Sequence, residues 1–149
     1  MPMDQSFVGR SFPFDRPYEV GRESIRTFAE AIGDDNPMYF DRVAAQSAGH
    51  PDVVAPPTFV IAVNAKAQDA VMFHPDLQLD YARVVHADQR FSYRRPIYAG
   101  DVLTSTVHID SIKLMAGNDF ITVRTDVHDA DGNLVCVASG TLVSRGGGD

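Results

Sequence analysis

The sequence has one cysteine and no tryptophan in 149 residues. The lone Cys136 cannot form a disulfide within the chain, and no neighbouring Cys or His is placed to share a metal ion with it. It lies in the apolar run Leu134–Val137, which predicts a buried small hydrophobe, the usual state of a free cysteine. Disulfide-stapled folds are therefore excluded.

Basic charge and long apolar runs are also scarce. The chain has 13 Lys and Arg against 20 Asp and Glu, a net charge of −7, which is the wrong sign for a protein that binds a phosphate backbone. We expect no nucleic-acid partner. No run approaches the ~20 apolar residues of a membrane-spanning helix, and the first residues lack the basic and apolar parts of a signal peptide. The sequence therefore predicts a cytoplasmic protein that does not span a membrane.

The composition that remains, 44% hydrophobic and 22% charged, is that of a globular protein. The length suits a single core and leaves no room for a second domain. We expect one domain over residues 1–145. The glycine-rich residues 146–149 are expected to form a flexible tail.

Two helices are predicted in the first half. Residues 22–32 place Ile25, Phe28, Ala29 and Ile32 at helical spacing, and Gly33 supplies a stop. A second helix is expected over residues 59–73, after Pro56-Pro57-Thr58. Its first turns are apolar all round, a pattern typical of a helix enclosed by other structure.

The second half alternates in the manner of strands. Strands are expected over 84–98, 102–114, around 121–127 and over 134–143, with a hairpin loop at 129–133. One buried helix followed by antiparallel strands is an α+β pattern in which a sheet packs on a single central helix. That order of elements is the order of the hot-dog fold.

Three motifs resemble those of MaoC-like hot-dog hydratases. Residues 33–41, Gly-Asp-Asp-Asn-Pro-Met-Tyr-Phe-Asp, resemble that family's signature Gly-Asp-x-Asn-Pro-(Ile/Leu)-His-x-Asp. Residues 53–59 look like the entry to its central helix, and residues 96–103 resemble its Pro-(Val/Ile)-x-x-Gly-Asp-x-Leu turn. Ala55-Pro56-Pro57-Thr58-Phe59, together with Tyr39, is more narrowly similar to the FAS1-like dehydratase domain group. That group includes the accessory subunit of (R)-3-hydroxyacyl-ACP dehydratases of type II fatty-acid synthesis.

The resemblance implies reversible removal of water between C2 and C3 of a 3-hydroxyacyl thioester, and it implies no cofactor. Asp34 falls at the position of the catalytic Asp, and Tyr39 at the position of the catalytic His. Imidazole suits proton transfer near neutral pH. A phenol, with an ordinary pKa of ~10, would need a shift of about three units to act as the base. We therefore expect Tyr39 to be inactive and to fill the volume of the His.

A second departure lies at the central helix. Active members of the family place a glycine at its N-terminus, and the glycine N–H polarises the thioester carbonyl. Pro57 falls at that position and has no N–H. The resemblance further implies substrate contacts from residues near these sites: Asn36, His50, Thr58, Phe59 and Val63. Asn36 also suits loop geometry, and His50 suits either the pocket or a solvated loop.

Three hypotheses for function follow. The first is a non-catalytic subunit that accommodates the acyl chain, paired with a MaoC-like subunit that carries Asp and His. The second is an autonomous (R)-specific enoyl-CoA hydratase that uses Asp34 with Tyr39 or His50. The third is a protein that binds acyl thioesters without turnover.

An exposed strand edge would be a liability, so we expect a homodimer or a heterodimer, with acyl-CoA or acyl-ACP as substrate. The five histidines lack metal-ligand spacing, and no metal is expected. Four arginines form a possible carrier-docking patch or a solvated strand face: Arg83, Arg90, Arg94 and Arg95.

Overall fold

The computed structural model of the protein describes residues 3–146. Its α-helices are α1 (Arg22–Ile32), α2 (Arg42–Ser47) and α3 (Val60–Met72), and its strands are β1 (Ser11–Pro13), β2 (Tyr18–Glu19), β3 (Val84–Tyr93), β4 (Val102–Met115), β5 (Asn118–His128) and β6 (Leu134–Ser144). Short 3₁₀ turns lie at Gln5–Phe7, Pro37–Tyr39, Pro75–Leu77 and Tyr81–Arg83.

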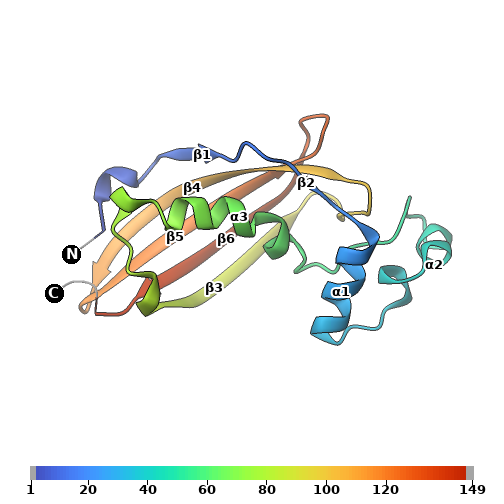
Figure 1. Ribbon diagram of the computed structural model, residues 1–149, viewed down its shortest axis with the longest axis horizontal. Helices are drawn as coiled ribbons and strands as arrows, with labels where there is room; N and C mark the ends of the chain where they lie inside the picture. The colour runs from blue at the N-terminus through green and yellow to red at the C-terminus, as the bar shows by residue number, and fades with distance from the viewer. Residues whose placement is uncertain (1–2, 147–149) are drawn as a thin grey trace.

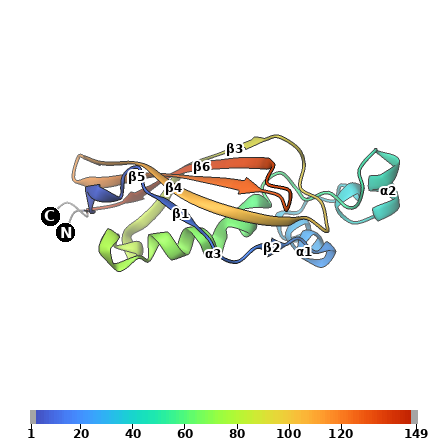
Figure 2. The same cartoon turned by 90° about the horizontal axis from the view of Figure 1, so that it is seen from above.

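One antiparallel sheet dominates the fold, with strand order β1-β4-β5-β6-β3, and β2 pairs with the start of β4. Figures 1 and 2 show α3 lying across one face of this sheet. Along β5 every second side chain is buried, as the period-two alternation requires when one face meets a core. The predicted α+β class and hot-dog fold are confirmed.

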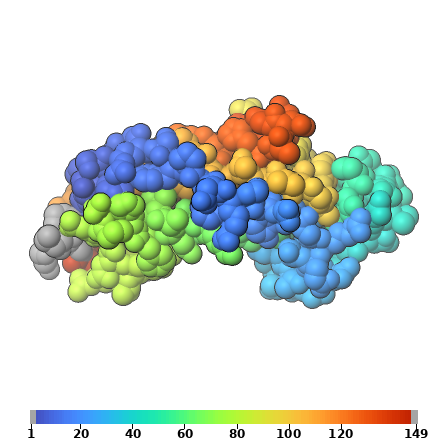
Figure 3. Space-filling model, turned by 45° about the horizontal axis from the view of Figure 1, so that its top comes forward, coloured from blue at the N-terminus to red at the C-terminus, as the bar shows by residue number. Residues whose placement is uncertain are grey.

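Helix α3 is buried on one side only. The side chains of Val60, Val63, Ala67 and Val71 are buried against the sheet and the N-terminal segment, whereas Ile61, in the apolar first turn, is 45% exposed. The expectation that other structure encloses this helix on all sides is therefore wrong for the described residues. Helix α1 packs through Ile25 and Ala29. Figures 1 and 3 show that α1 and α2 lie beyond one end of the sheet, and Figure 1 shows the hairpin that joins β4 to β5 at the opposite end.

The predicted elements agree with the observed ones except at one boundary. The helix expected over 59–73 spans Val60–Met72, and the loop expected at 129–133 joins β5 to β6. The strand expected over 84–98 is too long, since β3 ends at Tyr93, which pairs with Cys136. Pro96 lacks the N–H that a continued ladder would use, and the chain turns there toward β4.

The outer edge of β3 is unpaired within residues 3–146, because β6 occupies only its other side. This edge runs for ten residues. Gly146, expected in the flexible tail, donates its N–H to Asn118 and accepts a hydrogen bond from Arg83. Residues 147–149 of that tail lie outside the described residues. Within the described part of the chain, no helix is long and apolar enough to cross a membrane.

Candidate functional site

The segment after α1 carries the acidic residue expected to be catalytic. Gly33 ends α1 with a φ of 73°, and the N–H of Asp34 then donates to Ala29. The Asp34 carboxylate accepts from the N–H of Asn36, and the Asn36 side chain accepts from the N–H of Met38. Both side chains therefore form turns that start the Pro37–Tyr39 3₁₀ turn, which is the loop geometry considered for Asn36.

Tyr39 lies close to Asp34 and is buried. Burial, with a smaller contribution from the negative charge of Asp34, raises the pKa of the Tyr39 phenol above its usual range. The structure thus brings together the two residues predicted at the catalytic positions. The direction of the pKa shift keeps Tyr39 protonated, so it suits a hydrogen-bond donor and not a general base.

Three arginines line a hollow of about 170 Å³ together with Tyr39, Phe40 and Val53: Arg22, Arg26 and Arg42. Arg42 follows Tyr39 by three residues, whereas Arg22 and Arg26 come from α1. Two of the three are engaged by Asp52, and Arg26 pairs with Glu23.

Asp52 holds this end of the molecule together. Its carboxylate accepts two hydrogen bonds from Arg22, at 3.0 and 2.8 Å, and lies 3.7 Å from Arg42. The Arg22 hydrogen bond, with the Val53 N–H and the two charges, lowers the pKa of Asp52 from 3.8 to about 2, against the effect of burial. The carboxylate is therefore ionised in the folded protein at any pH above about 3.

Replacing Asp52 with Asn is expected to lower the free energy of unfolding by about 1 kcal/mol at pH 7, since the Arg22 side chain is half-exposed and solvent weakens the pair. The carboxyl has the lower pKa when folded, so its contribution is complete above the unfolded value of 3.8 and is lost as the pH falls toward 2. Urea unfolding from pH 7 to pH 3 measures the difference. Glu23→Gln, which removes an exposed pair, is the control. An Asp52→Asn deficit that stays constant down to pH 3 would contradict this account.

A tyrosine contacts the N-terminus of α3, the second place where the resemblance predicts part of the site. The Tyr93 hydroxyl, from the end of β3, donates to the Pro57 carbonyl. Burial raises the pKa of Tyr93 well above its usual range, and a hydrogen bond with the Val60 backbone opposes this shift. The Phe59 N–H donates to the Pro56 carbonyl, and Thr58 is exposed. Pro57 has no N–H to offer at this helix end.

His50 contacts Tyr98 and not Asp34. Its Nδ1 lies 3.2 Å from the Tyr98 hydroxyl, and the two rings are 5.5 Å apart. The loop before α3 is held in this way against the turn that precedes β4.

Phe59 and Val63, expected to contact substrate, lie in different surroundings. Phe59 is 1% exposed and packs edge-on against Tyr18 and Phe28 in the core. Val63 is buried and lines a groove between α3 and the N-terminal segment, together with Tyr18, Lys66 and Leu103. These two residues therefore lie on the side of α3 that faces the N-terminal segment.

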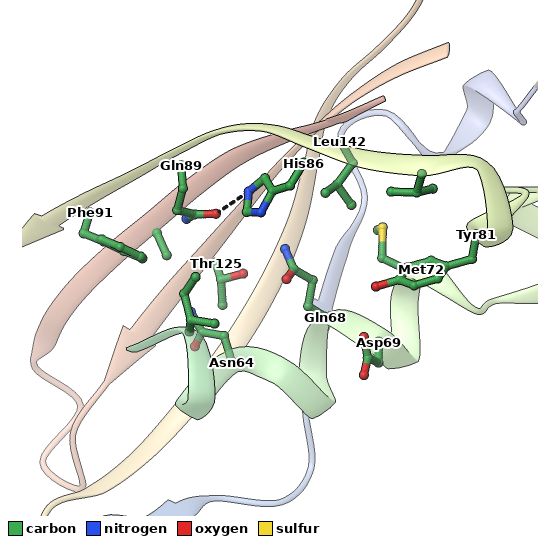
Figure 4. Close-up of a pocket in the computed structure, with 13 residues that line it drawn as sticks. Asn64, Gln68, Asp69, Met72, Tyr81, His86, Gln89, Phe91, Thr125 and Leu142 are labelled. Atoms are coloured by element: carbon green, nitrogen blue, oxygen red, sulfur yellow. Dashed lines mark hydrogen bonds between the residues drawn. The ribbon is translucent and has the colours of Figure 1, made fainter. Parts of the chain in front are cut away.

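A pocket of about 260 Å³ lies on the other side of α3, between the helix and the sheet. Figure 4 shows Asn64 and Gln68 of the helix facing Thr125 and Phe91 of the strands. Thr125, Ala138 and Phe91 are register partners on β5, β6 and β3, and they form a row across its floor. Its other lining residues are Ile61, Asp69, Met72, Tyr81, Val84, His86, Gln89 and Leu142.

Small residues on β6 make room for this pocket. Ala138 contributes only a methyl group to the floor, and the next inward position is Gly140. A Cβ on Gly140 would lie 2.5 Å from Gln89 Oε1 and 2.9 Å from the Asp88 carbonyl oxygen. Gly140 thus lets Gln89 lie across β6, where its Oε1 is 3.0 Å from His86 Nε2. The pocket was not predicted, because Ala138 and Gly140 mark it only once the register of β6 with its neighbours is known.

The four arginines of the suggested docking patch differ in whether a carboxylate already pairs with them. Arg95 is bound to Asp101 at 2.9 Å and to Asp129 at 3.5 Å, and Arg83 pairs with Asp80. Arg90 and Arg94 have exposed side chains. Two of the four charges are therefore already compensated, which favours a solvated strand face.

Cys136 is fully buried, as predicted, and burial raises the pKa of its thiol to about 11. It lies beside Tyr93. Among residues 3–146, no group of three or more His, Cys, Asp and Glu side chains is placed to hold a metal ion.

Comparison with known proteins places these features in a family context. Residues 6–138 match the family described as "FAS1-like, dehydratase domain region". The UPF0336 protein of Saccharopolyspora erythraea is 56% identical over 146 residues, covering 98% of this chain and 94% of its own.

Two solved structures have the same fold at a TM-score of 0.86. One is a chain of the C-terminally truncated HadBC (3R-hydroxyacyl-ACP dehydratase) complex of Mycobacterium tuberculosis, 33% identical, covering 96% of this chain and 99% of that one. The other is a MaoC-like dehydratase that is 36% identical to this chain. The match covers 94% of this chain and 42% of that one.

Proposed function

The chain belongs to the FAS1-like dehydratase domain family, and from this premise we propose that it is the acyl-chain-binding subunit of an (R)-specific 3-hydroxyacyl-thioester dehydratase. A second, MaoC-like chain supplies the catalytic Asp and His. The substrate is an acyl thioester of CoA or of acyl carrier protein, and the complex works in fatty-acid metabolism. The HadBC dehydratase, to which this chain is similar, is itself a complex.

The main support for the proposal is the missing N–H donor at Pro57, at the N-terminus of α3. Dehydration takes a proton from C2 and hydroxide from C3, which leave as water, and negative charge develops on the thioester oxygen in between. A backbone N–H at the helix N-terminus stabilises that charge, and loss of one such donor costs about 10²–10³ in rate. Here Pro57 has no N–H, and the Tyr93 hydroxyl donates to the Pro57 carbonyl at the same helix end. Burial raises the pKa of Tyr39, which moves the phenol further from the range that suits a general base.

The pocket under α3 supports the binding role. His86, Gln89 and Phe91 belong both to the pocket wall and to β3, whose outer edge is unpaired in the described residues. A second hot-dog chain paired along this edge would bring its own site beside the pocket. This chain then holds the acyl group in position and excludes water from it, while the partner carries out proton transfer.

The experiment is a hydration assay on crotonyl-CoA and longer enoyl thioesters, using the purified protein alone and co-produced with a MaoC-like partner. We expect no turnover by the protein alone and turnover by the complex. Asp34→Asn in this chain should change the activity of the complex less than about twofold, because the Asp34 carboxylate accepts a turn hydrogen bond from the Asn36 N–H and the partner supplies the catalytic Asp in this proposal. CoA and carrier-protein thioesters, compared in parallel, identify the carrier.

Two outcomes would overturn the proposal. Turnover by the lone protein that Asp34→Asn abolishes would establish the autonomous hydratase. Acyl thioester that copurifies but is not turned over in either assembly would establish a binding protein.

A further inference from the structure

Two polar side chains are buried in the pocket under α3, where a binding site for a plain alkyl chain would be apolar. Asn64 is 4% exposed and Thr125 is 2% exposed. The residues two positions away on the same row of β5, Val123 and Val127, are aliphatic. Both polar groups line the pocket, Asn64 from the helix and Thr125 from the floor (Figure 4).

The amide of Asn64 is held at one end only. Its Oδ1 accepts a hydrogen bond of 3.0 Å from the Ser105 hydroxyl, on the side of α3 away from the pocket. Whichever way the amide is turned, one polar atom faces Ser105 and the other is left for the pocket. Within residues 3–146, no fully buried side-chain nitrogen or oxygen lacks a partner. The free end of the amide is therefore reached from the pocket and not sealed in the core.

A ligand that fills this pocket must satisfy these groups. A hydrocarbon chain would strip water from the Asn64 amide and give no hydrogen bond in return, which is unfavourable for a buried polar group. An oxygen on the chain would replace that water. The mouth is polar as well, with Gln68 and Asp69 on the helix and Gln89 on β3. The volume of about 260 Å³ is just below the range of pockets for drug-sized ligands, so the pocket holds only part of a long acyl chain.

We infer that the pocket selects an acyl group that carries a hydrogen-bonding oxygen, as a hydroxyl or keto substituent, and that Asn64 is the residue that determines this specificity. Thr125 supplies a second polar contact at the floor. This inference rests on the proposed function, because it names the class of acyl chain that the subunit accommodates.

The test compares 2-decenoyl-CoA with analogues of the same chain length that carry one hydroxyl. The hydroxyl is placed in turn on each carbon beyond C3. The complex with its MaoC-like partner is assayed for kcat/KM. We expect at least one hydroxylated analogue to be preferred by about fivefold or more, the lower bound for leaving a buried polar group unpaired. Asn64→Leu, which keeps the branching at Cγ and replaces both polar atoms with methyl groups, should reverse the preference and favour the plain chain.

Thr125→Val is the second variant, since it removes one hydroxyl and keeps the shape of the side chain. It should reduce the preference without abolishing turnover, and it is informative even if Asn64→Leu does not fold. Equal turnover of plain and hydroxylated chains by the wild-type complex would overturn the inference and leave the proposed function intact. Turnover by the lone chain would instead count against the proposed function.

Discussion

Replacing Ala138 with Leu is expected to remove activity on long acyl chains and to leave activity on crotonyl-CoA unchanged. Ala138 lies at the centre of the pocket floor, between Thr125 and Phe91 on the neighbouring strands. Three additional carbon atoms at this position enter a space of about 260 Å³ that the acyl chain is proposed to use. One methylene in a hydrophobic pocket changes kcat/KM by about 10–200-fold, so we expect a loss of about a hundredfold or more.

The control for Ala138→Leu is Val137→Leu, which enlarges the preceding residue of β6. Val137 pairs with Asp126 and Ser92 and points to the opposite face of the sheet, away from the pocket. A series of enoyl-CoA lengths, assayed with the complex, gives the length at which each variant fails. If Ala138→Leu handled every length as the wild type does, the acyl chain would lie elsewhere, and the groove lined by Val63 would become the candidate.

The elements could be predicted because each depends on a short stretch of sequence. The alternation of Ile121, Val123 and Val127 identifies one buried face of β5 without reference to any other strand. Gly33 likewise predicts the end of α1 from a single position, because its φ of 73° is one that few other residues adopt. Such patterns predict the fold class and the order of elements along the chain, which is that of the hot-dog fold, whereas the order of the strands within the sheet comes from the structure.

The pocket could not be predicted because it depends on register. Thr125, Ala138 and Phe91 are distant in sequence, and only the pairing of β5, β6 and β3 places them in one row. A shift of one residue would turn each of them to the other face of the sheet. The substrate contacts expected at Phe59 and Val63 were implied by the resemblance, which does not reveal which side of the helix faces the core.

The same limit applies to the helix N-terminus. The absence of an amide at Pro57 follows directly from the sequence, but the hydroxyl that binds the Pro57 carbonyl belongs to Tyr93, 36 residues later. Two of the arginines in the hollow beside Tyr39, Arg22 and Arg26, likewise come from α1. The sequence therefore identifies where the chain departs from the family motifs, whereas only the structure identifies which side chains lie beside those positions.

Phe59→Ala tests whether Phe59 belongs to the core or to an acyl tunnel. We expect it to lower the free energy of unfolding by about 3–5 kcal/mol, because a buried ring in contact with Tyr18 and Phe28 is lost and a cavity remains. Phe73→Ala is the matched control, since its ring is 60% exposed and contacts Tyr81 at the surface, and it should cost less than about 1 kcal/mol. Urea unfolding at pH 7 measures both. A Phe59→Ala protein that kept wild-type stability and accepted longer acyl chains would place the tunnel beside Phe59. A large loss of stability agrees with a ring that anchors the start of α3, so that the pocket on the far side of the helix keeps its shape.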